Sequence, residues 1–332
     1  MSGPEVTLVV AAYNHERFIE DALEAAYAQT YPHLRVIITD DASRDGSQAL
    51  ITRLLQERGW EAQTILHREN RGICATFNEA LALADTPYIA FVSADDITEP
   101  DHLATQVAAL EAAGPDCAFA CSDMALMSEE GSLSGRLQSD VVGEVRASGR
   151  TAYLELLQGD YISAPTVVQR TEVLRRLGGY DESLQFEDWD MWLRMLKDHS
   201  FVYSPRPLVR YRIVEGSLGD VDRTRERRLR FAADSLALLR KHAGQAPDSD
   251  RALTKPLFTY GRELYLAGRL TAGEAAPLLI PYSSQTRYRG HVALALLARL
   301  GLPGTLWTRL KGGLTPLRRP SAAAPPDPSA PR

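Results

Sequence analysis

Two pairs of neighbouring aspartates carry the clearest chemical signal in this sequence. Asp40-Asp41 and Asp95-Asp96 each follow directly after a short apolar run. A single aspartate after a strand often only caps the next helix, by accepting its free backbone N–H groups. Two pairs at one edge of a sheet would repel each other unless a cation or a donor ligand lay between them. Hard carboxylate oxygens of this kind suit Mg²⁺ or Mn²⁺ bound together with the phosphates of a substrate.

A third acidic cluster, Glu187-Asp188-Trp189-Asp190, opens a stretch with helical spacing. Carboxylates in the first turn of a helix can simply be stabilised by the helix dipole. They can also act as a general base that removes a proton from a bound hydroxyl group. The second interpretation requires this cluster to face the same sheet edge as the aspartate pairs.

Four strand–helix units must position the aspartate pairs. Their strands are fully apolar, which is typical of a parallel sheet that is covered by helices on both faces. In such a sheet, ligands bind at the carboxyl ends of the strands, where both pairs stand. The expected strands are 5–12, 35–39, 62–67 and 88–93, and the expected helices are 15–29, 48–58, 73–84 and 102–112.

The pattern becomes looser after a further expected strand at 117–124. Residues 128–145 are polar and rich in Gly and Ser, which predicts a mobile loop or a hairpin. The strand expected at 201–213 contains Pro205 and Pro207, which is typical of an edge strand. Helices are expected at 151–158, 171–177 and 188–197, an extended segment at 162–169, and basic helices from 222 onward.

Charge divides the chain into two parts. The 332 residues have a net charge of −6, but residues 1–214 carry −15 and residues 215–332 carry +9. The densest basic run, Arg223 to Arg230, is either a solvated helix face or a surface for an anionic lipid-linked acceptor or membrane. Nucleic acid is not expected as a partner, because the acidic part would repel it and no recognition motif accompanies the run.

Cysteine content and hydropathy indicate the compartment. Three cysteines cannot form a complete set of disulfides, and the chain opens with polar residues. No run of 18 uncharged apolar residues is present, so a membrane-spanning helix is not expected. We therefore expect a cytoplasmic protein, with peripheral contact to an anionic membrane as an option for the basic second part.

Four longer segments carry a combined pattern. They read VTLVVAAYNHERFIEDALEAAYAQTYPHLRVIITDDASRDGS, HRENRGICATFNEAL, YIAFVSADD and GGYDESLQFEDWDMWLRM, and they cover most of residues 5–213. In this order they resemble the family 2 glycosyltransferases. The resemblance implies a GT-A fold, which is a Rossmann-like α/β domain with a mixed, mostly parallel sheet and helices on both faces. It also implies a nucleotide-diphospho-sugar donor, Mn²⁺ or Mg²⁺, and inversion at the anomeric carbon.

The resemblance assigns the donor to loops that follow the strands. Tyr13 matches a position near the base, and Asp41 matches a carboxylate that binds the base, for which uracil N3–H is a suitable donor. The loop around Asn70 and Gly72 resembles the segment beside the ribose and phosphates. The complete set of expected nucleotide-sugar contacts is Ala11, Tyr13, Glu16, Asp41, Asn70, Gly72, Ser93 and Ala94.

The resemblance also assigns the metal and the chemistry. Asp95 matches the last carboxylate of the D-x-D element and is the expected metal ligand. Asp188 matches the catalytic base, with Glu187 and Trp189 expected on the acceptor side. These roles agree with the chemistry, because a sugar hydroxyl needs a base and the departing diphosphate needs its charge neutralised.

Four positions depart from the family pattern. Ser93 replaces the first Asp of D-x-D, Ala11 replaces a common Pro, and Phe77 stands where an Arg is frequent. Val214 stands where many relatives carry a His near the metal. A metal site with one carboxylate remains sufficient for Mg²⁺, which keeps several waters and binds substrate phosphates.

The sequence therefore predicts an inverting glycosyltransferase that uses a nucleotide-diphospho-sugar, with a UDP-sugar favoured. The acceptor is expected to be a hydroxyl of a glycan or of a lipid-linked molecule, in cell-surface polysaccharide or glycoconjugate synthesis. A non-catalytic sugar-nucleotide-binding protein is one alternative. A sugar nucleotidyltransferase is another, although its Gly-rich phosphate loop is missing after the first strand.

Motif positions, charge and composition together predict three segments of the chain. Residues 1–218 form the expected glycosyltransferase domain, with a nucleotide-sugar half at 1–127 and an acceptor half at 128–218 that carries the base. Residues 219–312 form a basic helical extension, and 313–332 form a disordered Pro/Ala-rich tail that cannot pack a core.

Overall fold

The computed structural model describes residues 3–143, 148–214, 217, 224–286 and 288–310. The chain divides into two compact units, of which the first contains residues 1–227 and 241–253. The second contains residues 228–240 and 254–332. The tail expected at 313–332 and Arg223, the first residue of the basic run, lie outside the described residues.

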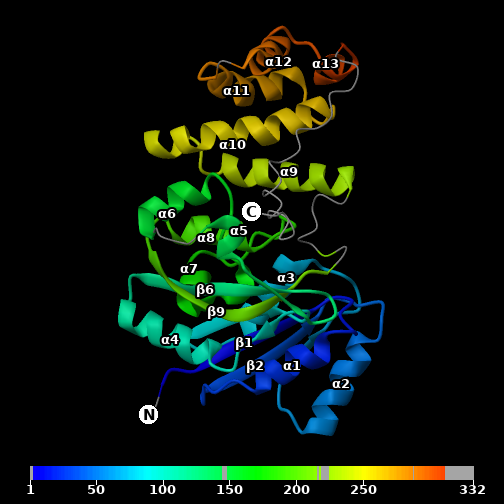
Figure 1. Cartoon of the computed structure of the whole chain (residues 1–332), viewed down its shortest axis with the longest axis vertical. Helices are drawn as coiled ribbons and strands as arrows, with labels where there is room; N and C mark the ends of the chain where they lie inside the picture. Colours follow the sequence, from blue (N-terminus) through cyan, green and yellow to red (C-terminus); the bar gives the residue numbers. More distant parts are fainter. Residues whose placement is uncertain (1–2, 144–147, 215–216, 218–223, 287, 311–332) are drawn as a thin grey trace, which may run out of the picture. The chain divides into compact units, whose positions relative to one another are not determined.

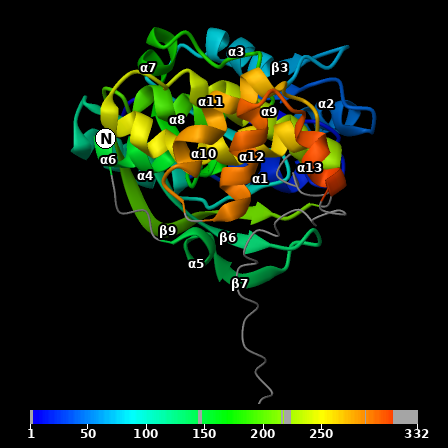
Figure 2. The ribbon, with the colours of Figure 1, turned by 90° about the horizontal axis from the view of Figure 1, so that it is seen from above.

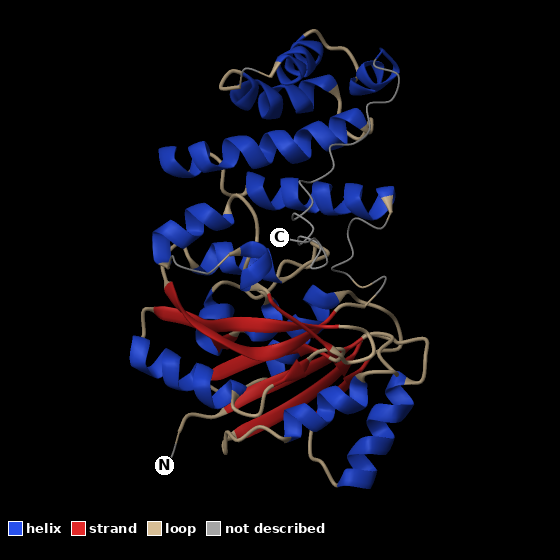
Figure 3. Ribbon diagram, in the orientation of Figure 1, coloured by secondary structure: helices blue, strands red, loops and turns tan. Residues whose placement is uncertain are grey.

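A nine-stranded sheet forms the centre of the first unit (Figure 3). Its strands are β1 (Val6–Ala12), β2 (Leu34–Asp40), β3 (Gln63–Leu66), β4 (Tyr88–Ser93), β5 (Ile97–Thr98), β6 (Cys117–Met127), β7 (Leu133–Leu137), β8 (Val168–Arg170) and β9 (Ser200–Arg212). The order is β3-β2-β1-β4-β8-β6-β9-β5, and β7 pairs with β6. The long pairings, β1 with β2, β1 with β4 and β6 with β9, are parallel. The mixed, mostly parallel sheet is confirmed.

Helices cover both faces of this sheet (Figures 1 and 2). They are α1 (Ile19–Tyr27), α2 (Ser47–Arg58), α3 (Ile73–Leu83), α4 (His102–Ala113), α5 (Ser139–Val142), α6 (Gly149–Leu156), α7 (Thr171–Arg176) and α8 (Asp188–Met195), with a 3₁₀ turn at Ala164–Thr166. Figure 1 shows α1, α2 and α4 on one face and α3, α7 and α8 on the other. This is the two-layered cover that fully apolar strands require.

The core explains why the first strand–helix unit forms. In α1 the buried residues Ile19, Ala22, Leu23 and Ala26 recur at intervals of three and four, which makes one apolar face. That face packs into a cluster with alternate residues of β1, including Leu8 and Val10. The packing fixes the end of β1, and therefore the loop that follows it, against the sheet.

The later part of the sheet contains β7 and β9, which were expected as a loop or hairpin and as an edge strand. The segment 128–145 contains β7, which pairs with β6 as an antiparallel hairpin. β9 lies between β6 and β5, but β5 pairs only with Val209 and Arg210 of β9. Among the described residues, the part of β9 that contains Pro205 and Pro207 therefore pairs with β6 alone, as expected of an edge strand. The register with β6 also shifts between Ser204 and Pro207, so a bulge accommodates the prolines on that side.

The expected C-terminal helices are present. They are α9 (Arg225–Arg240), α10 (Pro247–Leu266), α11 (Ala272–Ser283), α12 (Arg289–Arg299) and α13 (Gly304–Leu310). The second unit has its own apolar core, which includes Phe258, Tyr265, Leu279 and Leu294. Among the described residues, none of the helices combines the length and the apolar character that a membrane span needs.

Candidate active site

The loop after β1 is tied to the loop after β2. Asn14 donates its backbone N–H to Ser43 Oγ at 2.8 Å, and Arg44 donates its backbone N–H to Asn14 Oδ1 at 2.8 Å. Asn14 and Ala42 have φ values of 58° and 60°, which residues with a side chain rarely adopt. Such conformations persist only where the surroundings enforce them, and they gather at ligand sites.

Glu16 braces the same two loops. Its carboxylate accepts a hydrogen bond from the backbone N–H of Gly46 at 2.9 Å. A Cβ atom at Gly46 would lie 2.2 Å from Glu16 Oε1, so a larger residue at this position would displace the carboxylate of Glu16. Glu16 was expected to contact the nucleotide, and in the structure its carboxylate binds the backbone of the loop.

Asp41 holds the loop that follows β3. Its carboxylate accepts hydrogen bonds from the backbone N–H groups of Arg71 and Gly72, both at 2.8 Å. His67 Nδ1 also lies 2.8 Å from Asp41 Oδ1, and His67 Nε2 lies 3.1 Å from Glu79 Oε2. Asp41 is 6% exposed, so it lies behind the loop surface. His67 was not among the expected site residues, although it stands three positions before Asn70 of the N-R-G segment.

An open cleft of about 670 Å³ lies over these loops. Tyr13, which is 41% exposed, and Asn70 stand in its wall, so the structure brings together two of the expected nucleotide contacts. The lining residues are Tyr13, Ala42, Ser43, Arg44, Gln48, Leu66, His67, Arg68, Glu69 and Asn70. A mixed wall of one aromatic ring, amides and charged groups can bind a base and a ribose.

The ends of β1 and β4 are joined by the backbone. Ala94 is fully buried, and its N–H donates to the carbonyl oxygen of Ala11 at 2.8 Å. Ser93 ends β4 and accepts a hydrogen bond from the backbone N–H of Asp96, which closes a turn. The methyl group of Ala94 belongs to the core, so only backbone and neighbouring groups at this position can reach a ligand.

The second aspartate pair follows this turn. Asp95 is 8% exposed, and its Oδ2 lies 3.8 Å from Nε2 of His15. Asp96 is buried and accepts a hydrogen bond from the backbone N–H of Arg212 at 2.9 Å. Burial, and then the charge of Asp95, raise the pKa of Asp96. Asp96 is therefore a structural partner of β9, and Asp95 is the member of the pair that lies near His15.

Arg212 fixes the position of this turn. Its guanidinium is buried and donates to the carbonyl oxygens of Asp95 at 2.8 Å and Glu129 at 2.9 Å. It also reaches the carboxylate of Asp21 on α1 at 3.3 Å. Arg212 was not expected as a site residue, because the sequence near the end of a strand gives no local sign that an arginine is buried.

The acidic cluster at the start of α8 forms a second group of carboxylates. Burial, and then the charge of Asp188, raise the pKa of Glu187 to about 8. Burial also raises the pKa of Asp188, and the backbone N–H of Trp189, 2.7 Å from its Oδ1, opposes that effect. Burial therefore favours the protonated form of both carboxyl groups, and the backbone N–H of Trp189 favours the ionised form of Asp188.

Tyr211 connects the two acidic groups. Burial, and then the charges of Asp96, Asp95 and Asp188, raise the pKa of Tyr211 to about 12. A single phenol responds to all three carboxylates only if each of them lies near it, because the interaction weakens with distance. The structure thus brings the start of α8 to the same sheet edge as the turn after β4.

Trp189 differs from its expected place on the acceptor side. It is 2% exposed, and its indole N–H donates to the carbonyl oxygen of Leu156 at 2.7 Å. Trp192 is also 2% exposed and donates to the carbonyl oxygen of Ile162 at 3.3 Å. Both indoles pack in the core because each finds a partner for its single polar group there.

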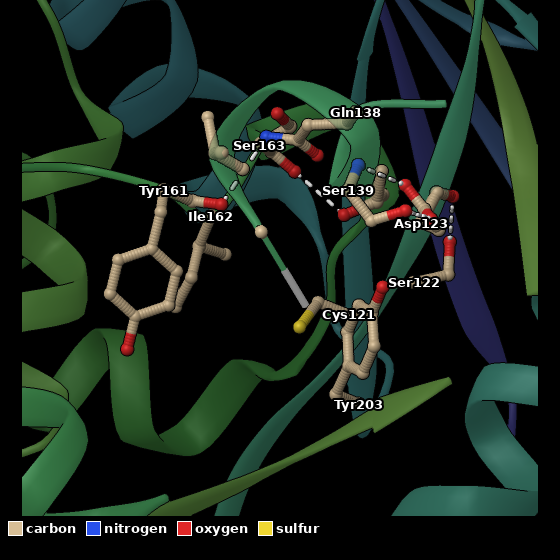
Figure 4. A pocket seen from close by; sticks show the side chains of 12 residues that line it. Cys121, Ser122, Asp123, Gln138, Ser139, Tyr161, Ile162, Ser163 and Tyr203 are labelled. Atoms are coloured by element: carbon tan, nitrogen blue, oxygen red, sulfur yellow. Dashed lines mark hydrogen bonds between the residues drawn. The ribbon is translucent and has the colours of Figure 1, made fainter. Parts of the chain in front are cut away.

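A second, smaller pocket lies beside the acceptor half of the sheet (Figure 4). Its volume is about 10 Å³, which is close to the minimum for one water molecule. Asp123 accepts hydrogen bonds from the backbone N–H and the hydroxyl group of Ser139 in its wall. Cys121 also lines it as a free buried thiol, whose pKa is raised by burial. This pocket is too small for a sugar.

Comparison with known proteins agrees with this geometry. Residues 7–137 match the sequence profile of the family described as Glycosyl transferase family 2. This chain carries a family 2 glycosyltransferase domain. The glycosyltransferase is 27% identical over 241 residues to the putative glycosyltransferase EpsE of Bacillus subtilis, which covers 72% of this chain and 81% of that protein. It is also 27% identical over 218 residues to the putative teichuronic acid biosynthesis glycosyltransferase TuaG of the same organism, over 65% of this chain and 81% of that one.

Solved structures share the fold of this glycosyltransferase. The mannosyltransferase PcManGT from Pyrobaculum calidifontis, in complex with GDP-Man and Mn²⁺, has a TM-score of 0.59 at 20% identity. The match covers 94% of this chain and 85% of that one. S. aureus TarS 1-349 in complex with UDP-GlcNAc has a TM-score of 0.60 at 15% identity and covers 94% and 93%. The GT-A fold expected from the sequence is confirmed.

Proposed function

We propose that this glycosyltransferase transfers a sugar from a nucleotide-diphospho-sugar to an acceptor hydroxyl with inversion. One observation carries the proposal: Asp188 and Asp95 belong to distant segments, yet both lie close enough to Tyr211 to raise its pKa. A base for the acceptor and a carboxylate for the metal–diphosphate group therefore share one sheet edge. A direct displacement needs these two groups and no protein nucleophile.

The donor nucleotide lies in the cleft formed by the loops after β1, β2 and β3. Its base and ribose contact Tyr13 and Asn70, which line that cleft. An ionised carboxylate has about four acceptor positions. Asp41 uses three of them for His67, Arg71 and Gly72, so one remains for uracil N3–H. This remaining position favours a UDP-sugar, and the UDP-GlcNAc complex of the structurally similar TarS supports it.

A divalent cation, Mg²⁺ or Mn²⁺, is held by Asp95 in this proposal. The residues fit such an ion, because Asp95 is only 8% exposed and its Oδ2 lies 3.8 Å from the imidazole of His15. Nδ1 of His15 is buried and has no hydrogen-bond partner among the described residues. The ion, when bound, neutralises the charge that develops on the departing diphosphate. Mn²⁺ in the PcManGT complex supports a cation of this class.

Asp188 removes the proton from the attacking hydroxyl. It stands at the first position of α8, where the helix dipole favours its ionised form. Glu187, with a pKa of about 8, keeps a proton at neutral pH and can donate a hydrogen bond to the acceptor. The names of the relatives support an acceptor in cell-surface polysaccharide synthesis, either a glycan or a lipid-linked molecule.

The substitution Asp188→Asn tests this function. Asparagine keeps the shape of the side chain but cannot take a proton, so kcat is expected to fall about 10²–10⁴-fold, the usual contribution of a general base. Donor affinity, measured by calorimetry, stays near that of the wild type because the cleft is unchanged. Glu187→Gln is the matched control, and its loss of kcat is expected to be smaller. A wild-type kcat in Asp188→Asn would disprove the assignment.

A non-catalytic nucleotide-sugar-binding role is separated from this function by donor turnover. The enzyme releases a nucleoside diphosphate from its donor in the presence of acceptor, whereas a binding protein shows affinity alone. A thermal-shift panel of UDP-, GDP-, dTDP- and CDP-sugars with Mn²⁺ identifies the donor, because a ligand at 100 Kd raises stability by about 2.7 kcal/mol.

A further inference from the structure

One helix of the second unit has an exposed apolar face. The buried face of α12 consists of Leu294, Ala295 and Ala298, which belong to the core of that unit. On the other face, Val292, Leu296 and Leu300 are 40%, 50% and 72% exposed. These residues are four apart, so they form a single stripe along the helix. A stripe of this kind usually marks a contact surface.

Further apolar side chains are exposed at both ends of the stripe. Tyr288, directly before α12, is 62% exposed, and Leu302, after its end, is 37% exposed. Ile280 on the preceding helix α11 is 38% exposed. Aromatic and aliphatic side chains that flank an apolar helical stripe are typical of helices that lie in the interface of a bilayer.

The sequence that contains this stripe carries charge of one sign. From Ala275 to Pro326 the sequence has no Asp or Glu. The same stretch contains seven cationic residues: Arg287, Arg289, Arg299, Lys311, Arg309, Arg318 and Arg319. Arg299 is exposed beside the stripe on α12. A second copy of this chain would bring cations against cations in a symmetric contact, which disfavours self-association through this face.

We propose that the face formed by Val292, Leu296 and Leu300 docks on the surface of an anionic bilayer, with α12 lying in the plane of the interface. The apolar stripe enters the boundary between head groups and acyl chains, and Arg299 beside it binds lipid phosphate. This inference goes beyond the transfer reaction and does not depend on it. It also accounts for the basic sign of the second unit, which the chemistry at the sheet edge does not require.

Co-sedimentation of the full chain with vesicles tests the proposal. Vesicles of equimolar phosphatidylcholine and phosphatidylglycerol are expected to bind the wild type, and pure phosphatidylcholine vesicles much less. Leu296→Ser removes buried apolar area and is expected to lower the partition coefficient about tenfold. Leu83→Ser is the matched control, since Leu83 on α3 is 47% exposed and Leu296 is 50% exposed. Arg299→Gln is expected to weaken binding to the anionic vesicles and to make that binding less dependent on salt concentration.

Three results would overturn this proposal. The first is equal binding of the wild type to both kinds of vesicle. The second is an equal loss of vesicle binding in Leu296→Ser and in Leu83→Ser. The third is a dimer of the wild type, seen by sedimentation velocity without lipid, that Leu296→Ser converts to a monomer. Donor turnover with a water-soluble acceptor is expected to be unchanged in both variants, which shows that they are folded.

Discussion

At the level of single residues, burial and neighbouring charges change the pKa values of particular acidic side chains of the site. Asp96 and Glu187 have raised pKa values, mainly because of burial, and each has an aspartate neighbour that adds to the shift. Asp95 and Asp188 are those neighbours. In the proposed mechanism, Asp95 and Asp188 are the members of the two pairs that act on the ligand.

Glu187 makes stability depend on pH. Its pKa rises from a usual 4.5 to about 8, so the folded protein holds a proton that the unfolded chain releases. This contribution to stability is complete below about pH 4.5 and is lost as the pH rises through about 8. We expect the wild-type Tm to fall over this range, and Glu187→Gln to flatten that fall. Glu172→Gln, at a side chain that is 79% exposed, is the control. A Tm of Glu187→Gln that falls with pH as steeply as that of the wild type would contradict this role of Glu187.

Asp95 is expected to couple the donor to the metal. Asp95→Ala removes the carboxylate that faces the diphosphate, so donor affinity in the presence of Mn²⁺ should fall about tenfold or more. Calorimetric titration of the donor with Mn²⁺ and with excess chelator measures the effect. Excess chelator should weaken donor binding to the wild type. It should not weaken donor binding to Asp95→Ala any further. Asp85→Ala, at a side chain 70% exposed, is the surface control.

At the level of elements, α8 depends on a segment that follows α9. Asp190 on α8 is 1% exposed, and its carboxylate binds Arg194 Nε at 2.6 Å and Lys241 Nζ at 2.8 Å. Lys241 also binds Asp181 at 2.5 Å, in the loop before α8. Residues 241–253 lie within the segment expected as a basic helical extension, and they belong to the first unit.

Lys241 is a positioning residue for the base helix. Lys241→Met removes one of two cations from the buried Asp190, which is expected to lower Tm and to reduce kcat several-fold, because α8 carries Asp188. Donor affinity stays unchanged, since the cleft contains no part of α8. Lys255→Met, at an exposed position of α10, is the control. If Lys241→Met weakened donor affinity and left kcat intact, this role would be refuted.

At the level of the whole molecule, donor binding and turnover should respond differently to truncation. A chain that ends near Leu218 retains every residue of the cleft but loses Lys241. We expect it to bind the donor with wild-type affinity and to turn over more slowly than the full chain. Calorimetry and a nucleoside diphosphate release assay measure the two quantities on the same preparation. Loss of donor affinity would show that the C-terminal residues also support the nucleotide half.

The strands, the helices and the order of the loops could be predicted from the sequence because they depend on local pattern. Apolar runs such as 88–93 form buried strands wherever they stand, and carboxylates after them must lie at the ends of those strands. The position of β9 could not be predicted. Its prolines indicate a strand with one open side, which they have because β5 pairs only with Val209 and Arg210, but they do not indicate the parallel pairing with β6 on the other side.

The sequence by itself determined the α/β fold and the acidic edge of the sheet, because both follow from hydrophobic period and residue type. Only the tertiary structure decided what each side chain does there. Glu16 serves the backbone of a loop, Trp189 lies in the core, and Lys241 reaches Asp190 from 51 residues away. The reason is physical: burial, pKa and hydrogen bonding depend on neighbours that are distant in sequence, and no local pattern records which neighbours the fold will supply.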